Sequence, residues 1–438
     1  MSDMDWNFSV SRDLYERARR VLPGGSTRGS ILYRPHPLYA VDGEGCRVRF
    51  EDGHEALDFL NNFTSLVLGH QHPGVMAAIR KQLDNGIALG APTRGEVELA
   101  ETLATRMPAV EQVVFSSTGS EAIMLALRLA RAATGRETIA KFEGGYHGAY
   151  DHVKVSAMVG PQDWGDELKP AAVADTAGIP ARVPSEVHVM QFNSVPSVEG
   201  VLHRHGDRIA ALIVEPVLGV GGLIAPQSGF LEALRALTEE RGIVLVFDEV
   251  ITQRLAVGGG QERFGVVPDL VVVSKVMGSG LPVSALGGPS RFMSALDATT
   301  PGGPVVYHSG TYNANPLSVA ASLATLDAID AQLIARLDSL GKAARAGLRE
   351  LFAARGFPMS VTGVGSLFNV HFTAKQPQTY RDVRRADVAR TQEFHRSMLR
   401  AGVLLATRGL GCISAPMGED EIDTLVSTTA RVLEEMGL

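Results

Sequence analysis

Four short apolar runs, separated by segments with helical periodicity, constrain the fold of this chain more than any other feature. The runs are rich in Val, Leu and Ile and span residues 112–115, 209–214, 243–247 and 270–273. Helical patterns, such as those at 96–106 and 121–133, alternate with them. Because such alternation is typical of a sheet covered by helices, we predict an α/β fold built on a mostly parallel sheet.

The composition excludes several functional classes. Apolar residues make up 45% of the 438 residues and charged residues 20%, which is typical of a globular enzyme. The formal net charge of −7 provides no global positive field for nucleic acid or for an anionic membrane. We therefore expect neither nucleic acid nor a membrane as a partner, and any anion site must be local.

The cysteine content and the N-terminus bear on the compartment. The two cysteines, Cys46 and Cys412, are too few for a disulfide framework or a cysteine-rich metal site. Residues 1–6 lack the basic and apolar parts of a targeting signal, and no stretch approaches the ~20 apolar residues of a membrane span. We expect a cytoplasmic protein without a metal site.

Three parts of the chain depart from the main alternation. Residues 37–60 alternate short apolar stretches with Asp-Gly and Glu-Gly pairs, which predicts small antiparallel strands of a minor lobe. Residues 155–186 are rich in Ala, Pro, Gly and Asp and too long for an ordinary connection, so they form either a lid or a variable surface excursion. After Pro316 a long helical pattern runs through Leu326 toward Phe352, and a C-terminal lobe follows.

A candidate anion site follows the run at 112–115. Residues 116–120 read Ser-Ser-Thr-Gly-Ser, and a helical pattern begins at Glu121. Free N–H groups at a helix start favour a phosphate, and Gly119 lets the backbone approach it. A helix capped by a hydroxyl side chain is the alternative. The segment is neither Gly-x-Gly-x-x-Gly nor a P-loop, which disfavours dinucleotide and ATP sites.

Asp248 follows the run at 243–247, at the carboxyl end of a predicted parallel strand, where ligands of such sheets bind. A carboxylate there can keep a pyridinium nitrogen protonated, and the protonated ring stabilises a carbanion. The alternatives are a helix-capping aspartate and a metal ligand. Because no further His, Cys or Asp stands nearby at ligand spacing, the metal alternative is disfavoured.

Lys275 follows the run at 270–273 and precedes the glycine-rich turn at 276–280. A lysine removed from water can lose its proton, and its free amine then adds to an aldehyde such as that of pyridoxal phosphate. A solvated surface lysine is the alternative. Glycines also flank the aromatic pair Tyr146 and His147, which could cover one face of a flat ring. A turn with a buried tyrosine is the alternative there.

The order of these motifs resembles that of the class III aminotransferases of fold type I. The motifs are Ser/Thr-Gly-Ser-Glu-Ala, Tyr-His-Gly, Glu215-Pro216-Val217, Asp248-Glu249-Val250, Lys275 and Gly310-Thr311-Tyr312-Asn313-Ala314-Asn315-Pro316. Within that class the chain is most similar to the branch of glutamate-1-semialdehyde aminomutase and the β-amino-acid (β-phenylalanine) aminotransferases. The resemblance implies a large domain at 66–315 and a small α+β domain formed by residues 1–65 and 316–438.

The resemblance also implies pyridoxal 5′-phosphate (PLP) as the cofactor, with Lys275 and Asp248 as catalytic residues. Lys275 would form the internal aldimine, and Asp248 would pair with the pyridine nitrogen. The other implied contacts are Tyr146 and Val250 on the two ring faces, His147 and Glu215 beside the cofactor, and Thr118, Gly119 and Ser120 at the phosphate. Thr311 would reach the phosphate of the neighbouring subunit, so a complete site requires a homodimer.

Two arginines bear on the reaction. Arg28 lies in the region where both members of the branch place a carboxylate-binding arginine, and a guanidinium fork suits a carboxylate. Arg408 lies where the β-amino-acid aminotransferases carry a second arginine, which receives the carboxylate of an α-keto acid. The mutase pattern lacks an arginine there. Residues 253–255, Gln-Arg-Leu, also depart from the mutase pattern.

These residues predict an aminotransferase that moves the amino group of a β-amino acid or a related aromatic amino acid to an α-keto acid such as 2-oxoglutarate or pyruvate. Glutamate-1-semialdehyde 2,1-aminomutase is the alternative, and a D-phenylglycine-type aminotransferase also fits. A binding protein that has retained the fold is disfavoured, because Lys275 and Asp248 are both present.

Overall fold

The computed structural model describes residues 6–438. We predict that residues 1–6 contain no targeting signal. Of these residues only Trp6 is described, so this prediction lies outside the described residues. The chain divides into two compact units. Unit 1 consists of Met1–His72, Arg336–Gln376 and Arg385–Leu438, and unit 2 consists of Pro73–Ala335 and Pro377–Arg384.

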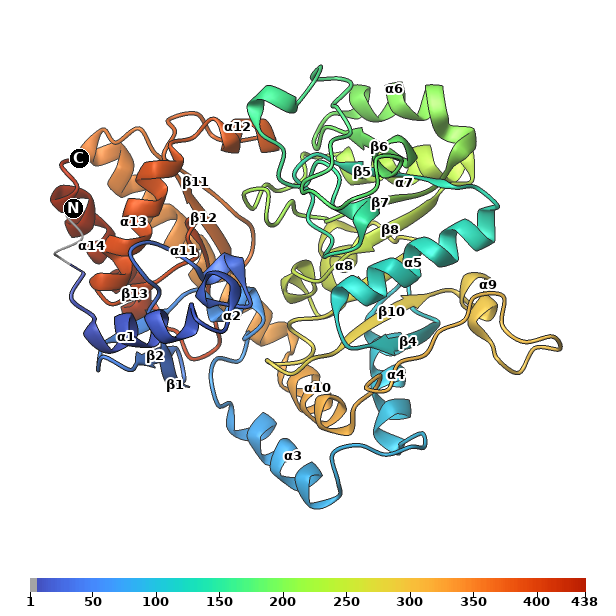
Figure 1. Ribbon diagram of the computed structural model, residues 1–438, viewed down its shortest axis with the longest axis horizontal. Helices are drawn as coiled ribbons and strands as arrows, with labels where there is room; N and C mark the ends of the chain where they lie inside the picture. Colours follow the sequence, from blue (N-terminus) through green and yellow to red (C-terminus); the bar gives the residue numbers. More distant parts are fainter. Residues whose placement is uncertain (1–5) are drawn as a thin grey trace. The chain divides into compact units, whose positions relative to one another are not determined.

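A seven-stranded sheet forms the centre of unit 2 (Figure 1). Its strands, in spatial order, are β4 (Gln112–Ser116), β10 (Ser284–Gly288), β9 (Leu270–Val273), β8 (Val244–Asp248), β7 (Ile209–Val214), β5 (Thr138–Phe142) and β6 (Val187–Met190). The five strands from β9 to β6 are parallel, whereas β10 runs antiparallel to both of its neighbours. The predicted α/β architecture with a mostly parallel sheet is confirmed.

The helices of unit 2 are interspersed with its strands along the chain. They are α3 (Pro73–Asp84), α4 (Arg94–Arg106), α5 (Gly119–Thr134), α6 (Val195–His205), α7 (Phe230–Arg241), α8 (Gly259–Phe264), α9 (Ser290–Met293), α10 (Pro316–Ala328) and α12 (Tyr380–Arg384). Helices α3 and α4 precede the first of these strands along the chain. The helices α4 and α5 correspond to the patterns predicted at 96–106 and 121–133.

Both faces of the central sheet are buried, which explains the apolar runs in the sequence. Along β9, Val271 and Val273 belong to one hydrophobic core, and Leu270 and Val272 belong to the other. Helices α4, α6, α7 and α10 contribute buried side chains to the first core, and α5 and α9 contribute to the second. Because the strands are covered on both sides, most polar side chains of the sheet lie at the strand ends.

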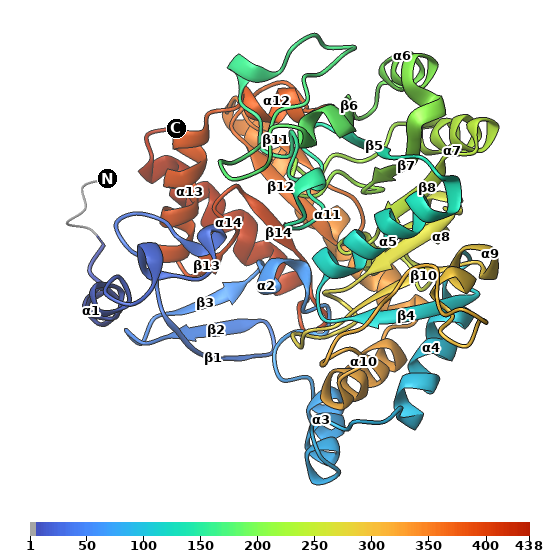
Figure 2. The same ribbon diagram turned by 45° about the vertical axis from the view of Figure 1, so that its right-hand side comes forward.

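Unit 1 contains two small sheets in its described part. The first has the order β1 (Ala40–Glu44), β2 (Arg47–Phe50), β3 (Glu55–Asp58) and β13 (Val403–Leu404), and the second has the order β11 (Ser360–Thr362), β12 (Leu367–His371) and β14 (Leu410–Cys412). Its helices are α1 (Ser9–Ala18), α2 (Asn61–Thr64), α13 (Val388–Arg400), α14 (Glu419–Glu435) and most of α11 (Ala331–Arg355). Figure 2 shows β13 in the same sheet as β1, β2 and β3, so both ends of the chain build this sheet.

The limits of the units differ from the predicted boundaries at 65 and 315. Unit 1 extends to His72, because Gly45 and His70 form a β-bridge that joins this stretch to the N-terminal strands. Unit 2 extends to Ala335, because α10 buries Val319 and Leu326 in the core that α4 also lines. Helix α10 thus belongs to unit 2.

The long helix predicted from Pro316 toward Phe352 is two helices, α10 and α11. The chain turns at Ile329, and the Oδ1 atom of Asp330 accepts a hydrogen bond from the N–H of Leu333 at 2.7 Å, which caps the start of α11. Among the described residues no single helix is long and apolar enough to cross a membrane, and only the bent pair α10 and α11 together meets that length and composition.

Residues 155–186 are anchored in unit 2. Val155, Ala157, Val159 and Trp164 are buried, and the backbone forms isolated bridges between Val155 and Ala174 and between Gly165 and Pro170. The first part of the segment is therefore anchored, whereas Met158 and Leu168 are each 51% exposed, and both interpretations, a lid and a surface excursion, stay predictions.

Gly341 of α11 provides a test of packing in unit 1. A Cβ atom at this position would lie 2.1 Å from the carbonyl oxygen of Gly365. Although alanine stabilises an exposed helix by roughly 1 kcal/mol relative to glycine, the clash with backbone should lower the free energy of unfolding of Gly341→Ala by about 1–3 kcal/mol. Thermal denaturation measures this change. The control is Gly200→Ala in α6, where the nearest neighbour of the Cβ is the flexible Arg204 side chain at 3.4 Å. Equal stability of the two variants would contradict this packing.

Candidate active site

Five loops of unit 2 begin where strands of the central sheet end. Strands β5, β7, β8 and β9 are parallel to one another. Strand β4 runs in the same direction, because β4 and β9 are both antiparallel to β10. We call the shared edge the carboxyl edge. It carries Thr118 after β4, Tyr146 and His147 after β5, Glu215 after β7, Asp248 and Val250 at and after β8, and Lys275 after β9. Ligands of open α/β sheets bind at this edge.

Asp248 ends β8 and is only 4% exposed. Its Oδ2 atom lies 2.8 Å from Nδ1 of His147, and its Oδ1 atom accepts a hydrogen bond from the N–H of Val250 at 3.1 Å. Burial lowers the pKa of His147, and this effect outweighs the opposing influence of Asp248. A neutral His147 therefore donates its N–H from Nδ1 and orients the carboxylate.

Glu215 is a second buried carboxyl group at this edge. Its Oε1 atom accepts a hydrogen bond from the N–H of Tyr146 at 3.0 Å, and its Oε2 atom accepts one from the N–H of Gly219 at 3.1 Å. Burial, followed by the nearby charge of Asp248, raises the pKa of Glu215 to about 8, while Lys275 acts in the opposite direction. Glu215 therefore binds a proton near neutral pH and anchors the backbone at Tyr146.

Lys275 has an unusual backbone conformation. Its φ is +43°, and Ser279 in the same turn has a φ of +45°. Residues other than glycine rarely adopt a positive φ, and those that do cluster at functional sites. The hydroxyl of Ser274 donates a hydrogen bond to the carbonyl of Val283 at 2.8 Å, which closes the turn around Lys275. The ammonium group lies near enough to Glu215 to affect the pKa of that carboxyl group.

The start of α5 is capped and also offers free donors. The Oγ1 atom of Thr118 accepts a hydrogen bond from the N–H of Glu121 at 3.3 Å, and Oε2 of Glu121 accepts one from the N–H of Thr118 at 2.7 Å. Within residues 6–438 the backbone N–H groups of Gly119 and Ser120 have no hydrogen-bond acceptor. They lie at the positive end of the helix dipole. The capped helix and the phosphate cradle are therefore compatible.

Two glycines allow the loops of the site to touch. A Cβ atom at Gly119 would lie 3.1 Å from Cγ2 of Val250, and one at Gly148 would lie 2.2 Å from Oγ of Ser120. The same Oγ atom accepts a hydrogen bond from the N–H of Ala149 at 3.1 Å. The start of α5 thus packs against both the Val250 loop and the turn that carries the aromatic pair.

Tyr146 lies at the surface of unit 2, with 42% of its area exposed. The Nζ atom of Lys154 lies 5.7 Å from the centre of its ring, and that ammonium lies 3.6 Å from Oδ2 of Asp175. Since Glu215 holds the backbone of Tyr146, the phenol ring is an exposed plane on a fixed support, as the stacking role requires.

The two arginines of interest both belong to unit 1. Arg28 is exposed, and its Nη1 atom donates a hydrogen bond to Oδ1 of Asn62 at 3.1 Å. Asn62 lies in α2, where all four residues have a positive φ between 45° and 75°. Arg28 and residues 405–407 line one cavity of about 330 Å³, and the half-buried Arg408 follows directly in the sequence.

Thr311 lies in an exposed loop of unit 2. Three apolar or aromatic side chains of this stretch are also largely exposed: Val305 at 75%, Tyr307 at 72% and Tyr312 at 67%. In the same loop, Nε2 of His308 lies 2.9 Å from the carbonyl oxygen of Phe115, which ties the loop to the end of β4.

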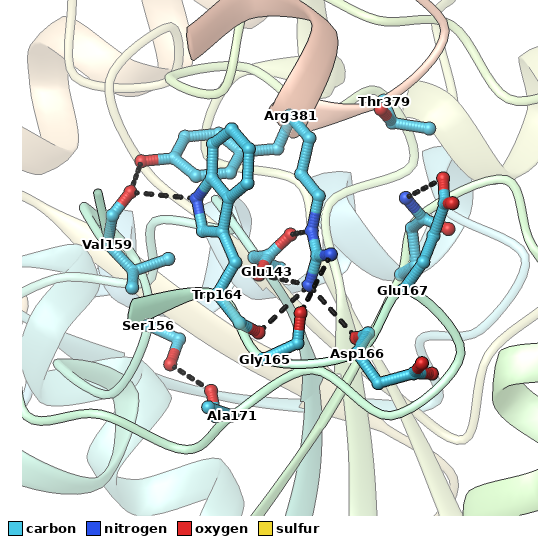
Figure 3. Close-up of polar contacts among 12 residues, drawn as sticks. Glu143, Ser156, Val159, Trp164, Gly165, Asp166, Glu167, Ala171, Thr379 and Arg381 are labelled. Carbon is cyan, nitrogen blue, oxygen red and sulfur yellow. Dashed lines mark hydrogen bonds and ion pairs between the residues drawn. The ribbon is translucent and has the colours of Figure 1, made fainter. Parts of the chain in front are cut away.

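A residue that the sequence did not indicate also bears on the site. Arg381 of α12 forms a buried ion pair with Glu143, which directly follows β5 (Figure 3). Burial raises the pKa of Glu143, and the guanidinium opposes this effect. Breaking a buried pair of this kind typically costs about 3–5 kcal/mol. The only sequence signal was the position of Glu143 beside the Gly-Gly-Tyr-His motif.

Comparison with known proteins defines the family. Residues 32–419 match the family model described as aminotransferase class-III. The chain belongs to this family. Glutamate-1-semialdehyde 2,1-aminomutase of Methanothermobacter thermautotrophicus is 39% identical over 97% of this chain and 98% of that protein.

Solved structures show the same fold. An ω-transaminase from Sphaerobacter thermophilus is 40% identical, with a TM-score of 0.93 over 97% of each chain. A β-phenylalanine aminotransferase from Variovorax paradoxus is 32% identical, with a TM-score of 0.89 over 99% of this chain and 95% of that one. A transaminase with PLP bound is 37% identical, with a TM-score of 0.90 over 98% of each chain. This class III chain is thus a PLP-dependent enzyme of fold type I.

The residues at the carboxyl edge fit PLP. The unpaired N–H groups of Gly119 and Ser120 suit a phosphate, and a Cβ atom at Gly119 would crowd Val250 at 3.1 Å. The buried carboxylate of Asp248 suits a ring nitrogen that carries a proton, and the amine of Lys275 suits the aldehyde.

Glu215 should couple stability to pH. A carboxyl group whose pKa rises from 4.5 to about 8 on folding binds its proton more tightly in the folded chain. Its contribution to stability is therefore complete below about pH 4.5 and is lost as the pH rises through about 8. Because Glu215→Gln lacks this proton, the stability of the variant relative to the parent should increase between about pH 5 and pH 8.5. Thermal midpoints of both proteins across this range measure the difference, and a constant difference would refute the raised pKa.

Proposed function

We propose that this class III enzyme is an aminotransferase that moves the amino group of a β-amino acid, or a related aromatic amino acid, to an α-keto acid. The cavity in unit 1 carries the proposal. It places Arg28 beside largely apolar walls that include Tyr33, Leu38, Phe50, Leu60, Phe63 and Leu405. An aromatic carboxylic acid complements this cavity, because its carboxylate can bind the guanidinium and its ring can contact the apolar walls.

Arg408 favours transfer between two molecules. A transaminase must accept an amino donor and then a keto acid, whereas a mutase moves the amine within one substrate. Arg408 directly follows residues 405–407, which line the same cavity as Arg28, and a second guanidinium beside this cavity would suit the carboxylate of a keto acid. The names of the Sphaerobacter and Variovorax proteins are consistent with this reaction.

Glutamate-1-semialdehyde 2,1-aminomutase is the second candidate. The mutase of Methanothermobacter is 39% identical over nearly the whole chain, and this relationship favours the mutase over our first candidate. Glutamate-1-semialdehyde also carries a carboxylate, which Arg28 suits equally well. The two candidates therefore share the carboxyl edge and differ in the need for a keto acid.

In the proposed mechanism, side chains of unit 2 hold the cofactor and move one proton. PLP, when bound, supplies an aldehyde that reacts with amines and a protonated ring that accepts electrons. Asp248, oriented by His147, would hold the proton on the ring nitrogen, and the N–H groups of Gly119 and Ser120 would hold the phosphate. The Nζ atom of Lys275 would take a proton from the amine-bearing carbon of the substrate and deliver it to the carbon that PLP supplies, a form of general acid–base catalysis worth about 10²–10⁴-fold.

The enzyme is proposed to act as a homodimer in the cytoplasm, with Thr311 completing the phosphate site of the neighbouring subunit. The exposed side chains of Val305, Tyr307 and Tyr312 support an interface at this loop, because apolar surface on this scale is typical of contact with a partner. A cytoplasmic location is consistent with the absence of a disulfide between Cys46 and Cys412.

Lys275→Ala tests the proposed amine. Without Nζ the proton has no carrier, so we expect turnover to fall by about 10²–10⁴-fold or more. Borohydride reduction followed by peptide mass spectrometry should attach PLP to the parent at Lys275 and should leave the variant unlabelled. The control is Lys342→Ala, an exposed residue of α11 that should retain both properties. Parental turnover by Lys275→Ala would eliminate the assigned role.

Dependence on a keto acid separates the two candidate functions. The panel consists of both enantiomers of β-phenylalanine, D-phenylglycine and glutamate-1-semialdehyde, each assayed with and without 2-oxoglutarate or pyruvate. We expect aromatic donors to react only when a keto acid is present. Rapid conversion of glutamate-1-semialdehyde to 5-aminolevulinate without a keto acid, combined with inert aromatic donors, would instead establish the mutase.

Arg408→Ala tests the second arginine in the same panel. This variant should raise the KM for the keto acid by roughly tenfold or more, as the loss of a charged hydrogen bond predicts, whereas the exposed control Arg390→Ala should not.

A further inference from the structure

Arg381 and Glu143, which are 238 positions apart in the sequence, form an ion pair inside unit 2. Nε of Arg381 donates to Oε2 of Glu143 at 2.7 Å, and Nη2 donates to Oε1 at 3.1 Å. Only 5% of Arg381 and 1% of Glu143 is exposed. Two parallel bonds of this kind determine the orientation of both groups, because the planar guanidinium matches the carboxylate.

The remaining donors of Arg381 hold the anchored part of residues 155–186. The guanidinium donates to the carbonyl oxygens of Trp164 at 2.9 Å, Gly165 at 3.3 Å and Asp166 at 3.1 Å, and it lies 5.3 Å from the centre of the Trp164 ring. Figure 3 shows these carbonyl groups pointing toward the guanidinium. The neighbouring Tyr380 adds a hydrogen bond from its hydroxyl to the carbonyl of Val159 at 2.9 Å.

The same helix presses on the turn that carries the aromatic pair. A Cβ atom at Gly144, where φ is +77°, would lie 2.2 Å from Cδ2 of Tyr380. The N–H of Gly144 donates a hydrogen bond to the carbonyl of Ser156 at 2.9 Å. The turn thus lies between α12 on one side and the anchored segment on the other, and Arg381 bonds to both.

Downstream, this turn makes the two contacts that orient the carboxyl edge. The N–H of Tyr146 binds Glu215, and His147 binds Asp248. Both residues lie within four positions of Glu143, so a rotation of the backbone at Glu143 displaces both contacts. Arg381 belongs to the short segment Pro377–Arg384, which is part of unit 2 although the residues on either side of the segment belong to unit 1.

We infer that Arg381 is a positioning residue of the cofactor site: through Glu143 it holds the turn at 143–147 so that His147 orients Asp248 and Tyr146 covers the ring. The inference rests on the proposed roles of Asp248 and Tyr146 in holding PLP. Arg381 acts through Glu143 and has no chemical role of its own. Lysine does not substitute for it, because an ammonium lacks the planar fork and cannot bond to the carboxylate and three carbonyl oxygens together.

The experiment compares Arg381→Lys and Arg381→Met with the control Arg182→Met, an exposed arginine of the same 155–186 segment. Each protein is freed of PLP and checked for folding by far-ultraviolet circular dichroism. PLP affinity and the visible circular dichroism of bound PLP are then measured. We expect both Arg381 variants to bind PLP about 10- to 100-fold more weakly, by analogy with other residues that orient a binding side chain, and to change the visible dichroism. Arg182→Met should match the parent.

Several outcomes are decisive. Folded Arg381 variants with parental affinity and dichroism would overturn the inference, since a residue of merely structural importance lowers thermal stability without altering the bound cofactor. If Arg381→Met does not fold, the double variant Glu143→Gln with Arg381→Gln removes both charges together and carries the same expectation.

The control for the proposed function is Asp248→Asn. If this variant binds PLP weakly while the Arg381 variants bind normally, only the positioning role fails. If the parent itself does not bind PLP, or if Asp248→Asn binds it as the parent does, the proposed site fails and the positioning role fails with it.

Discussion

Burial of both faces of the seven-stranded sheet is the constraint on which the rest of this structure depends. Helices cover the strands on both sides, so water is excluded from most of each strand. A polar side chain inside the sheet must find partners there, and the low-cost positions for such groups are the strand ends. The carboxyl edge therefore collects the reactive side chains, and each is held by the strand that precedes it.

At that edge, the physical difficulty is to maintain two buried carboxyl groups close together. Burial and then the charge of Asp248 raise the pKa of Glu215, and the structure gives the two groups different surroundings. Asp248 receives the N–H of Val250 and the imidazole of His147, whereas Glu215 takes up a proton and binds backbone N–H groups. One group then faces the place proposed for the cofactor ring, and the other supports Tyr146.

The strands that sequence reasoning predicted are those with uninterrupted apolar runs: β4, β7, β8 and β9. It missed β5, where Lys141 interrupts the pattern although the residue is fully buried. Its ammonium donates hydrogen bonds to the carbonyls of Phe142 and Val155, and these contacts make its burial possible. It also missed β6 and β10. In β10 a glycine, Gly287, interrupts the apolar pattern, and a Cβ atom there would lie 2.6 Å from Cγ2 of Val110. In β5 and β10, the residue that interrupts the apolar pattern is therefore explained by a contact with a residue elsewhere in the sequence.

The sequence by itself determined the class of fold, the family and the nature of the cofactor, because these follow from local order: an apolar run, then a turn, then Thr118, Asp248 or Lys275. A strand end carries its side chain to the edge wherever the strand lies in the sheet. Tertiary structure alone decided which groups meet there. The pairing of His147 with Asp248, the protonation of Glu215 and the link from Arg381 to Glu143 depend on distances between segments far apart in the chain. Electrostatic and hydrogen-bond energies depend steeply on such distances, and sequence order does not encode them.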